Sequence, residues 1–142
     1  MKPARTWPNG WSGSVYLDLD VILAELKADD WLSSVVDIDA IDEPKTSVAT
    51  GIELQYVMED EWARDRVVRA HNEILDCDIE LVPLVPDALD AAAELRARYD
   101  ALNVFDGVHL GSAQVLDESI VSTDTLFPEI PEIDHIDPRN LE

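Results

Sequence analysis

Four carboxylates of this 142-residue sequence stand where an α/β fold can bring them together. Asp18 and Asp124 each follow a short apolar run of the kind that forms a β-strand. Glu53 and Asp106 lie near the beginnings of predicted helices that follow connecting segments. Ligands of open α/β sheets bind outside the carboxyl ends of the parallel strands, so we expect all four side chains at that edge.

Such a cluster is suited to metal-dependent chemistry. Carboxylates in close contact repel and raise one another's pKa values, and a bound cation removes this conflict. Hard oxygen ligands without a matching Cys or His set favour Mg²⁺ or Mn²⁺ over Zn²⁺. An Asp after a strand is, however, more often a cap or a turn residue, and chance groupings are easy among 31 acidic residues. Spacing alone therefore leaves both interpretations open.

The histidines add no metal motif, because His71, His109 and His135 show no common ligand spacing. We interpret His109 as a packed helix residue. Cys77 is the only cysteine, which excludes an internal disulfide and a cysteine-based metal cage.

The elements that must position the four acids alternate between strand and helix. Short β-prone runs predict strands over residues 14–17, 46–50, 79–85, 120–123 and 133–136. Helical patterns occupy residues 21–26, 51–75 with a break near 58–60, 86 to about 102, and 104–117. The polar stretch 37–45 is predicted to be a loop. This order predicts an α/β sandwich with a mainly parallel sheet.

Three details of the helices and strands can be tested directly. Pro83 favours an edge position for the third strand. On the helix that opens at Pro86, apolar residues follow at steps of four and three, which predicts one buried stripe. Gly107 and Gly111 would allow a neighbour to approach the next helix closely. The stripe consists of Ala88, Ala92, Leu95, Tyr99 and Leu102.

Four segments resemble, in order, the motifs of the PIN-domain family. The family's opening strand ending in Asp is matched by VYLDLDVILAEL, and its Thr-Ser strand followed by Glu is matched by TSVATGIEL. Its Asp followed by His-Leu and a small-residue helix is matched by VFDGVHLGSAQ. Its last motif, a Ser or Thr two residues before Asp, is matched by IVSTDTLF. The resemblance spans residues 15–138, and the ordered set is much more specific than any single motif.

The resemblance implies a PIN-like three-layer sandwich over residues 14–138, with helices flanking a mainly parallel central sheet. Residues 1–13 are predicted to be an irregular arm and residues 139–142 a short tail. The implied activity is hydrolysis of RNA phosphodiester bonds with Mg²⁺ or Mn²⁺. The implied metal-binding catalytic acids are Asp18, Glu53, Asp106 and Asp124, with Ser122 as a supporting hydroxyl.

The resemblance also suggests a biological role. Small single-domain members of the family are commonly VapC-type toxins, which implies a small antitoxin as partner and a homodimer. Stand-alone RNA-processing nucleases share the same acids, so the sequence does not decide between the two roles. Asp20 stands where the family usually has Asn, Ser or Thr. We interpret Asp20 as the cap of the first helix, with a fifth metal ligand as the alternative.

Other functions fit the sequence less well. DLDV also resembles the nucleophile motif of haloacid dehalogenase-type phosphatases, and an Asp cluster in an α/β domain resembles response-regulator receivers. Both families use a lysine in the later half of the chain, whereas no lysine follows Lys45 here. The alternative of a different class is a non-catalytic acidic protein that mimics nucleic acid, and the ordered motifs argue against it.

The charge predicts an unusual environment. Acidic residues outnumber basic ones 31 to 10, for a net charge of −21, and lysine is scarce. Such self-repulsion is tolerable where salt screens it, since the Debye length is about 3 Å at 1 M. We predict a halophilic protein, with an acidic mesophilic protein as the alternative. The absence of a signal-like apolar segment or a membrane-length apolar run predicts a cytoplasmic location.

Two groups of residues are candidates for contacts with partners. Arg64, Arg66 and Arg69 on one predicted helix, and Arg96 and Arg98 on another, could hold RNA phosphates or dock an acidic part of an antitoxin. Ordinary ion pairing with nearby acids is the alternative. Three tryptophans are candidate apolar contacts for a homodimer, with core packing as the alternative for the last: Trp7, Trp11 and Trp62.

Overall fold

The computed structural model describes residues 14–27, 41 and 43–140. Five strands form one sheet in the order β3-β2-β1-β4-β5, and every neighbouring pair is parallel. The strands are β1 (Ser14–Leu17), β2 (Glu43–Ser47), β3 (Glu80–Val82), β4 (Ile120–Val121) and β5 (His135–Ile136). The mainly parallel sheet expected from the sequence is therefore confirmed.

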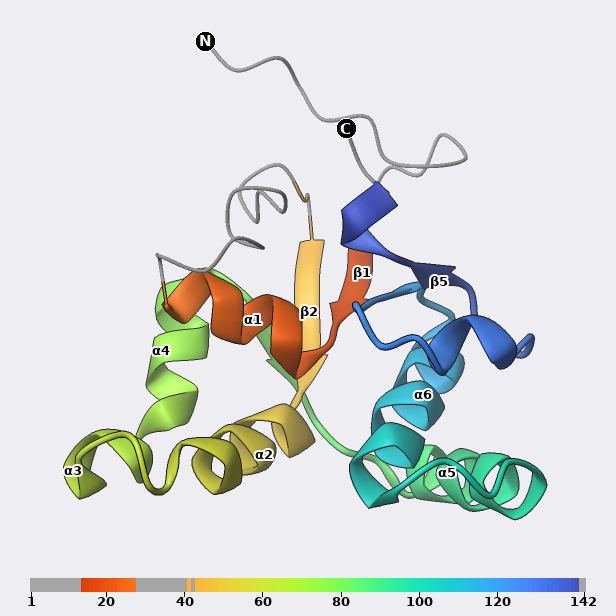
Figure 1. Ribbon diagram of the computed structural model, residues 1–142, viewed down its shortest axis with the longest axis horizontal. Coiled ribbons are helices and arrows are strands. Elements are labelled where there is room, and N and C mark those ends of the chain that lie inside the picture. The colour runs from red at the N-terminus through yellow and green to blue at the C-terminus, as the bar shows by residue number, and fades with distance from the viewer. Residues whose placement is uncertain (1–13, 28–40, 42, 141–142) are drawn as a thin grey trace, which may run out of the picture.

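Helices cover both faces of this sheet, which gives three layers (Figure 1). On one face lie α1 (Leu19–Leu26), α2 (Val48–Met58) and α4 (Ala70–Asp76), with the short α3 (Arg64–Val67) beyond them. On the other lie α5 (Pro86–Arg98) and α6 (Val104–Leu116). Two 3₁₀ turns, Phe127–Glu129 and Pro138–Asn140, follow β4 and β5. None of the helices in the described ranges is long and apolar enough to cross a bilayer.

The central strand β1 separates two hydrophobic cores. Val15 and Leu17 pack with α1, α2 and α4, whereas Tyr16 packs with α5 and α6. All three side chains are fully buried, because successive residues of a strand point to opposite faces and both faces are covered. The continuous apolar run VYL is the sequence pattern of such a doubly covered strand.

The helices α5 and α6 form the tightest packing unit of the fold. The predicted stripe is confirmed in part, since Ala88, Ala92 and Leu95 are buried on α5. The helix ends at Arg98, so the partly buried Tyr99 and the buried Leu102 follow it and do not belong to it. A Cβ on Gly111 would lie 2.6 Å from the Ala88 carbonyl oxygen, so the backbones meet where the glycine allows it. The close approach predicted for this glycine is confirmed.

The second strand was placed wrongly. The sequence predicted a loop over 37–45 and a strand over 46–50, but β2 begins at Glu43 and α2 begins at Val48. Pairing of β2 with β3 starts only at Lys45, so at Pro44 the strand has a neighbour on one side, β1. The missing N–H of Pro44 is therefore tolerated, as it would be on an edge strand. As a result Glu53 lies in the second turn of α2, not in the first. Residues 37–40 lie outside the described residues.

The prediction of helix over 51–75 with a break near 58–60 is confirmed, but the second half divides again into α3 and α4. Because the chain is interrupted between α3 and α4, only some of the apolar residues in this region face the core. Val67 and Ile74 are buried, whereas Val68 and Leu75 are 42% and 47% exposed. The third strand lies at the edge of the sheet, as predicted, but it ends at Val82, before Pro83, and does not extend to residue 85.

Candidate active site

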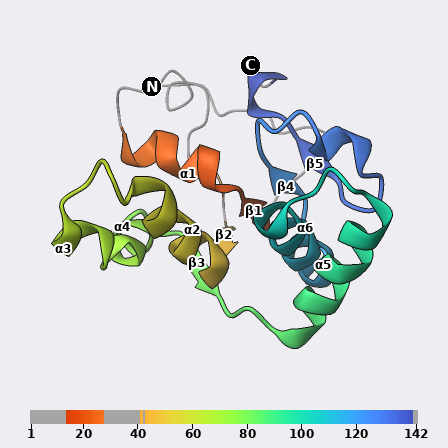
Figure 2. The same ribbon diagram turned by 60° about the horizontal axis from the view of Figure 1, so that its bottom comes forward.

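The candidate site lies at the carboxyl ends of β1 and β4, where β1 leads into α1 and α2 approaches α6 (Figure 2). Asp18 is the N-cap of α1, and its Oδ1 accepts the Leu19 backbone N–H at 2.8 Å. Its Oδ2 accepts the Ser122 hydroxyl, which follows β4, at 2.7 Å. The start of α1 and the segment after β4 therefore orient the two oxygens of one carboxyl group.

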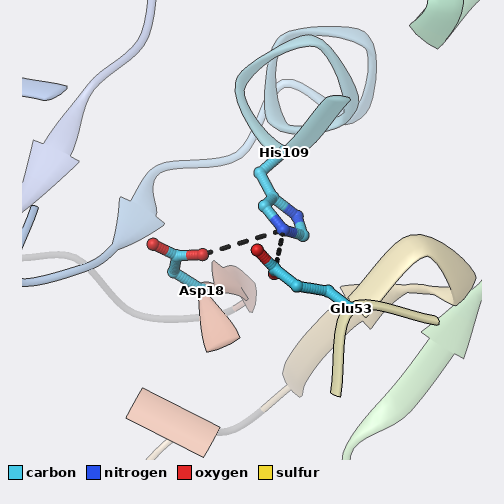
Figure 3. A group of neighbouring side chains, drawn as sticks. All are labelled: Asp18, Glu53 and His109. Carbon is cyan, nitrogen blue, oxygen red and sulfur yellow. Dashed lines mark hydrogen bonds and ion pairs between the residues drawn. The ribbon is translucent and has the colours of Figure 1, made fainter. Parts of the chain in front are cut away.

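Glu53 and His109 complete the centre of the site (Figure 3). His109 Nε2 lies 2.7 Å from Glu53 Oε1 and 3.9 Å from Asp18 Oδ1. Within the described part of the chain, Asp18, Glu53 and His109 form a group in which one ligand atom from each residue lies within 4.8 Å of the others. These residues come from the start of α1, from α2 and from α6.

His109 lies at the centre of the site, a position that the sequence did not predict. The ring is only 1% exposed, as expected for a packed helix residue, but its Nε2 faces the two carboxylates. One available signal was its position three residues after Asp106, because residues three apart on a helix share a face. The contact with Glu53 bridges 56 positions of the chain and has no local signature.

Asp106 and Asp124 lie around this centre and are not part of the 4.8 Å group. Asp106 forms a capping box with Asn103 at the start of α6. Burial raises the pKa of Asp106, and the charges of Asp124 and Glu53 raise it further, which places the acids within electrostatic reach. Asp124 accepts the Leu126 N–H at 2.8 Å, and its own N–H donates to Ser122 Oγ at 3.0 Å. The structure thus gathers all five predicted site residues at one edge of the sheet.

Burial and neighbouring charges shift the pKa values of two groups at the centre of the site. Burial raises the pKa of Asp18 to about 7, the nearby Asp20 adds to the shift, and His109 and Ser122 reduce it. Burial alone would lower the pKa of His109, but Tyr16, Glu53 and Asp18 outweigh it and raise the pKa to about 10. A buried acid that resists ionisation beside other acids gains from a nearby positive charge.

Comparison with known proteins identifies the family. The family model described as PIN domain matches residues 15–133, which is most of the chain. The chain belongs to the PIN domain family. No curated protein matches the sequence.

Solved structures share the fold of this PIN domain. A chain of VapBC2 from Rickettsia felis, solved bound to a DNA fragment from their promoter, matches with a TM-score of 0.70 and 15% identity over 87% of this chain and 97% of that one. A chain of DNA-bound VapBC from Salmonella typhimurium gives a TM-score of 0.67 and 18% identity over 90% and 99%. FitAcB from Neisseria gonorrhoeae gives 0.65 and 16% over 89% and 99%.

Asp20, the departure from the usual motif, has a different role from the one predicted. The N-cap of α1 in this PIN domain is Asp18, so the prediction that Asp20 caps the helix is wrong. Asp20 Oδ2 accepts both the backbone N–H and the hydroxyl of Thr123, while its Oδ1 accepts the Val21 N–H at 2.8 Å. The side chain therefore ties the start of α1 to the segment that carries Asp124.

The arginines of this PIN domain divide into paired and unpaired groups. Arg66 makes two hydrogen bonds to Glu73, at 2.7 and 2.8 Å, and stacks over Trp62, so the ion-pair alternative holds for it. Arg98 pairs with Glu132. Trp62 packs against the core, while Trp7 and Trp11 lie outside the described residues. Arg64, Arg69 and Arg96 make no ion pair with any acid in the described ranges.

Proposed function

We propose that this protein is a divalent-metal-dependent ribonuclease. Membership of the PIN domain family and the convergence of Asp18 and Glu53 on one buried centre carry the proposal. In this proposal Asp18, Glu53, Asp106 and Asp124 are the metal-binding catalytic acids, and Ser122 is the supporting hydroxyl. The proposed chemical class of the substrate is an RNA phosphodiester.

The donor set fits a hard divalent cation. Asp18 and Glu53 offer carboxylate oxygens within a few ångströms of one another, and burial disfavours the metal-free ionised state of Asp18. Carboxylate oxygens suit Mg²⁺ and Mn²⁺. His109 lies within the same group, but the preference for Mg²⁺ or Mn²⁺ rests on the carboxylate oxygens.

The residues of the chain have separate tasks in this reaction. A divalent metal held by Asp18, Glu53, Asp106 and Asp124 would supply activation of a water for in-line attack and stabilisation of charge on the phosphate. The Ser122 hydroxyl and the Leu19 N–H orient the two oxygens of Asp18. Two groups of hydrogen bonds hold the segment after β4 in place. Thr123 donates to Asp20, and the Asp124 N–H donates to Ser122 Oγ. Positioning of this kind reduces the reorganisation required during phosphodiester cleavage.

The cellular role that we propose is that of the toxin in a VapBC-type pair, working in the cytoplasm as a homodimer with a small antitoxin. The similar solved structures include toxin–antitoxin complexes, and this chain covers 97% or more of the chains compared above. A stand-alone processing nuclease with the same acids is the second candidate, since the candidate site would be identical.

The activity is tested with purified protein and a labelled single-stranded RNA. We expect cleavage with Mg²⁺ or Mn²⁺, loss of cleavage on chelation, and loss in Asp18→Asn and Asp106→Asn. Asp90→Asn, which removes one exposed charge from α5, is the matched control and should retain activity. Cleavage by Asp18→Asn at the wild-type rate, or undiminished cleavage in excess chelator, would refute the assignment.

The toxin role is tested separately through the neighbouring reading frame. A small protein encoded beside this gene should co-purify with the chain and inhibit its nuclease activity. An active nuclease that has no such inhibitor, and whose expression does not slow growth, would favour the stand-alone alternative.

A further inference from the structure

We propose that His109, held by Tyr16, is a positioning residue that fixes the Glu53 carboxylate through Oε1 and leaves Oε2 for the metal. The inference rests on the proposed function, because it presupposes a metal bound by the four predicted acids. It assigns a role to a residue outside those four. It makes His109 an outer partner of the metal site and not one of its ligands.

A chain of short contacts carries the inference. Ser47 Oγ lies 2.8 Å from the Tyr16 hydroxyl, which lies 2.7 Å from His109 Nδ1. On the other side of the ring, Nε2 lies 2.7 Å from Glu53 Oε1. Tyr16 and Ser47 are fully buried and His109 is 1% exposed, so water does not compete for these contacts.

The hydrogen positions follow from what each group can donate. An ionised carboxylate only accepts, so the short contact with Glu53 places a hydrogen on Nε2. The Tyr16 hydroxyl can donate to an unprotonated Nδ1 or accept from a protonated one, so the arrangement holds for neutral and charged imidazole alike. A nitrogen that carries a hydrogen has no lone pair for a metal.

The consequence is a carboxylate with one oxygen engaged and one oxygen available. Glu53 Oε1 is bound to His109, and within the described residues Oε2 makes no hydrogen bond. Ligating carboxylates are commonly held in this way by outer hydrogen bonds, and loss of such a partner typically reduces metal affinity about 10- to 100-fold. The ring is held at Nδ1 by Tyr16 of β1, and the Tyr16 hydroxyl is in turn held by Ser47, the N-cap residue of α2.

The test measures Mn²⁺ binding to the full chain by titration calorimetry, without RNA. We expect Tyr16→Phe and His109→Leu to weaken Mn²⁺ binding by about 10-fold or more. His109→Gln, whose amide can donate to Glu53 from nearly the same place as Nε2, should recover most of the affinity. Tyr99→Phe removes a tyrosine hydroxyl that donates to Glu132 away from the site, and should match the wild type.

Electron spin-echo modulation of the Mn²⁺ complex supplies the second measurement. The wild type should show no directly coordinated imidazole nitrogen. A coordinated nitrogen that disappears in His109→Leu would overturn the inference, because His109 would then be a ligand. Unchanged Mn²⁺ affinity in Tyr16→Phe, with native circular dichroism, would also overturn it. Failure of the wild type to bind Mn²⁺ would instead refute the proposed function on which the inference rests.

Discussion

The buried carboxyl group of Asp18 couples the stability of the metal-free protein to pH. Its pKa is raised by burial from 3.8 to about 7 in the folded state. The folded protein therefore holds this proton more tightly than the unfolded chain does. A carboxyl group of this kind favours folding most below about pH 4, and its contribution is lost as the pH rises to about 7.

We therefore expect the free energy of unfolding, measured in chelator by urea denaturation, to fall between pH 4 and pH 7 relative to Asp18→Asn. Burial raises the pKa values of Asp20 and Asp106 in the same direction, so Asp18→Asn should reduce the slope without abolishing it. The exposed control Asp90→Asn should keep the wild-type slope. Superimposable pH profiles for Asp18→Asn and the wild type would contradict this account.

Ser112 offers a second test at the scale of one residue. Its side chain is 4% exposed, and its hydroxyl is the one buried side-chain group within the described residues that lacks a hydrogen-bond partner. A buried unsatisfied hydroxyl costs about 1–3 kcal/mol, so Ser112→Ala should stabilise the protein by about 1 kcal/mol in chemical denaturation. Ser122→Ala removes a hydroxyl with two partners and should not stabilise the metal-free protein. Equal effects of the two variants would argue against this explanation.

At the scale of elements, the contact between α5 and α6 depends on Gly111. A Cβ there would lie 2.6 Å from Ala88 O and 2.8 Å from Ala92 N, which are backbone atoms that cannot move aside alone. Overpacking of this kind typically costs about 1–3 kcal/mol, and we expect Gly111→Ala to lower the free energy of unfolding by that amount. Because α6 carries Asp106 and His109, Mn²⁺ binding should also weaken.

Gly51→Ala is the matched control, because it adds the same methyl group to α2, 3.5 Å from His71 Cβ. That distance is ordinary contact, and alanine is favoured over glycine within a helix by about 0.5–1 kcal/mol. The control should therefore be neutral or stabilising. A destabilisation by Gly51→Ala as large as that by Gly111→Ala would show that space between α5 and α6 is not the cause.

At the scale of the whole molecule, the net charge of −21 dominates solution behaviour. The Debye length falls from about 10 Å at 0.1 M to about 3 Å at 1 M, so salt screens repulsion within the chain and between chain and RNA. We expect both the unfolding midpoint and RNA cleavage to persist or rise as KCl increases from 0.1 M to 2 M. Activity that is highest in dilute buffer and falls steadily with KCl would contradict the halophilic interpretation.

In the proposed nuclease, the arginines that lack an ion pair among the described residues are the candidates for binding RNA despite the negative net charge. Arg96 donates to Leu102 O at 3.3 Å and lies against Gly107, the neighbour of Asp106, without an ion pair among the described acids. In an Asp18→Asn background, Arg96→Ala should weaken RNA binding about tenfold by fluorescence anisotropy, which corresponds to about 1.4 kcal/mol. Arg98→Ala makes the same charge change on the same helix, but Arg98 is already paired with Glu132. An equal loss in both variants would point to net charge and not to a contact.

Local sequence patterns were enough to predict which edge of the sheet carries the acids. Asp18 and Asp124 follow β-prone runs, and Asp106 lies in the first turn of a predicted helix, so local patterns were sufficient to place them at one edge. The spacing of Ala88, Ala92 and Leu95 likewise encodes the buried face of α5. These features depend on neighbours within a few turns, and a single sequence records such neighbours directly.

The residues that complete the site could be identified only in the folded chain. Tyr16 and His109 are 93 positions apart, and Asp20 and Thr123 are 103 positions apart, so no local pattern joins them. The order of the strands places β1 beside β4. Because side chains alternate along β1, Tyr16 points toward α6, and Asp18 lies in the site because it follows the end of the strand. Burial removes water from these contacts, so a polar group left without a hydrogen-bond partner would destabilise the fold. These groups therefore pair with residues that are distant in the sequence.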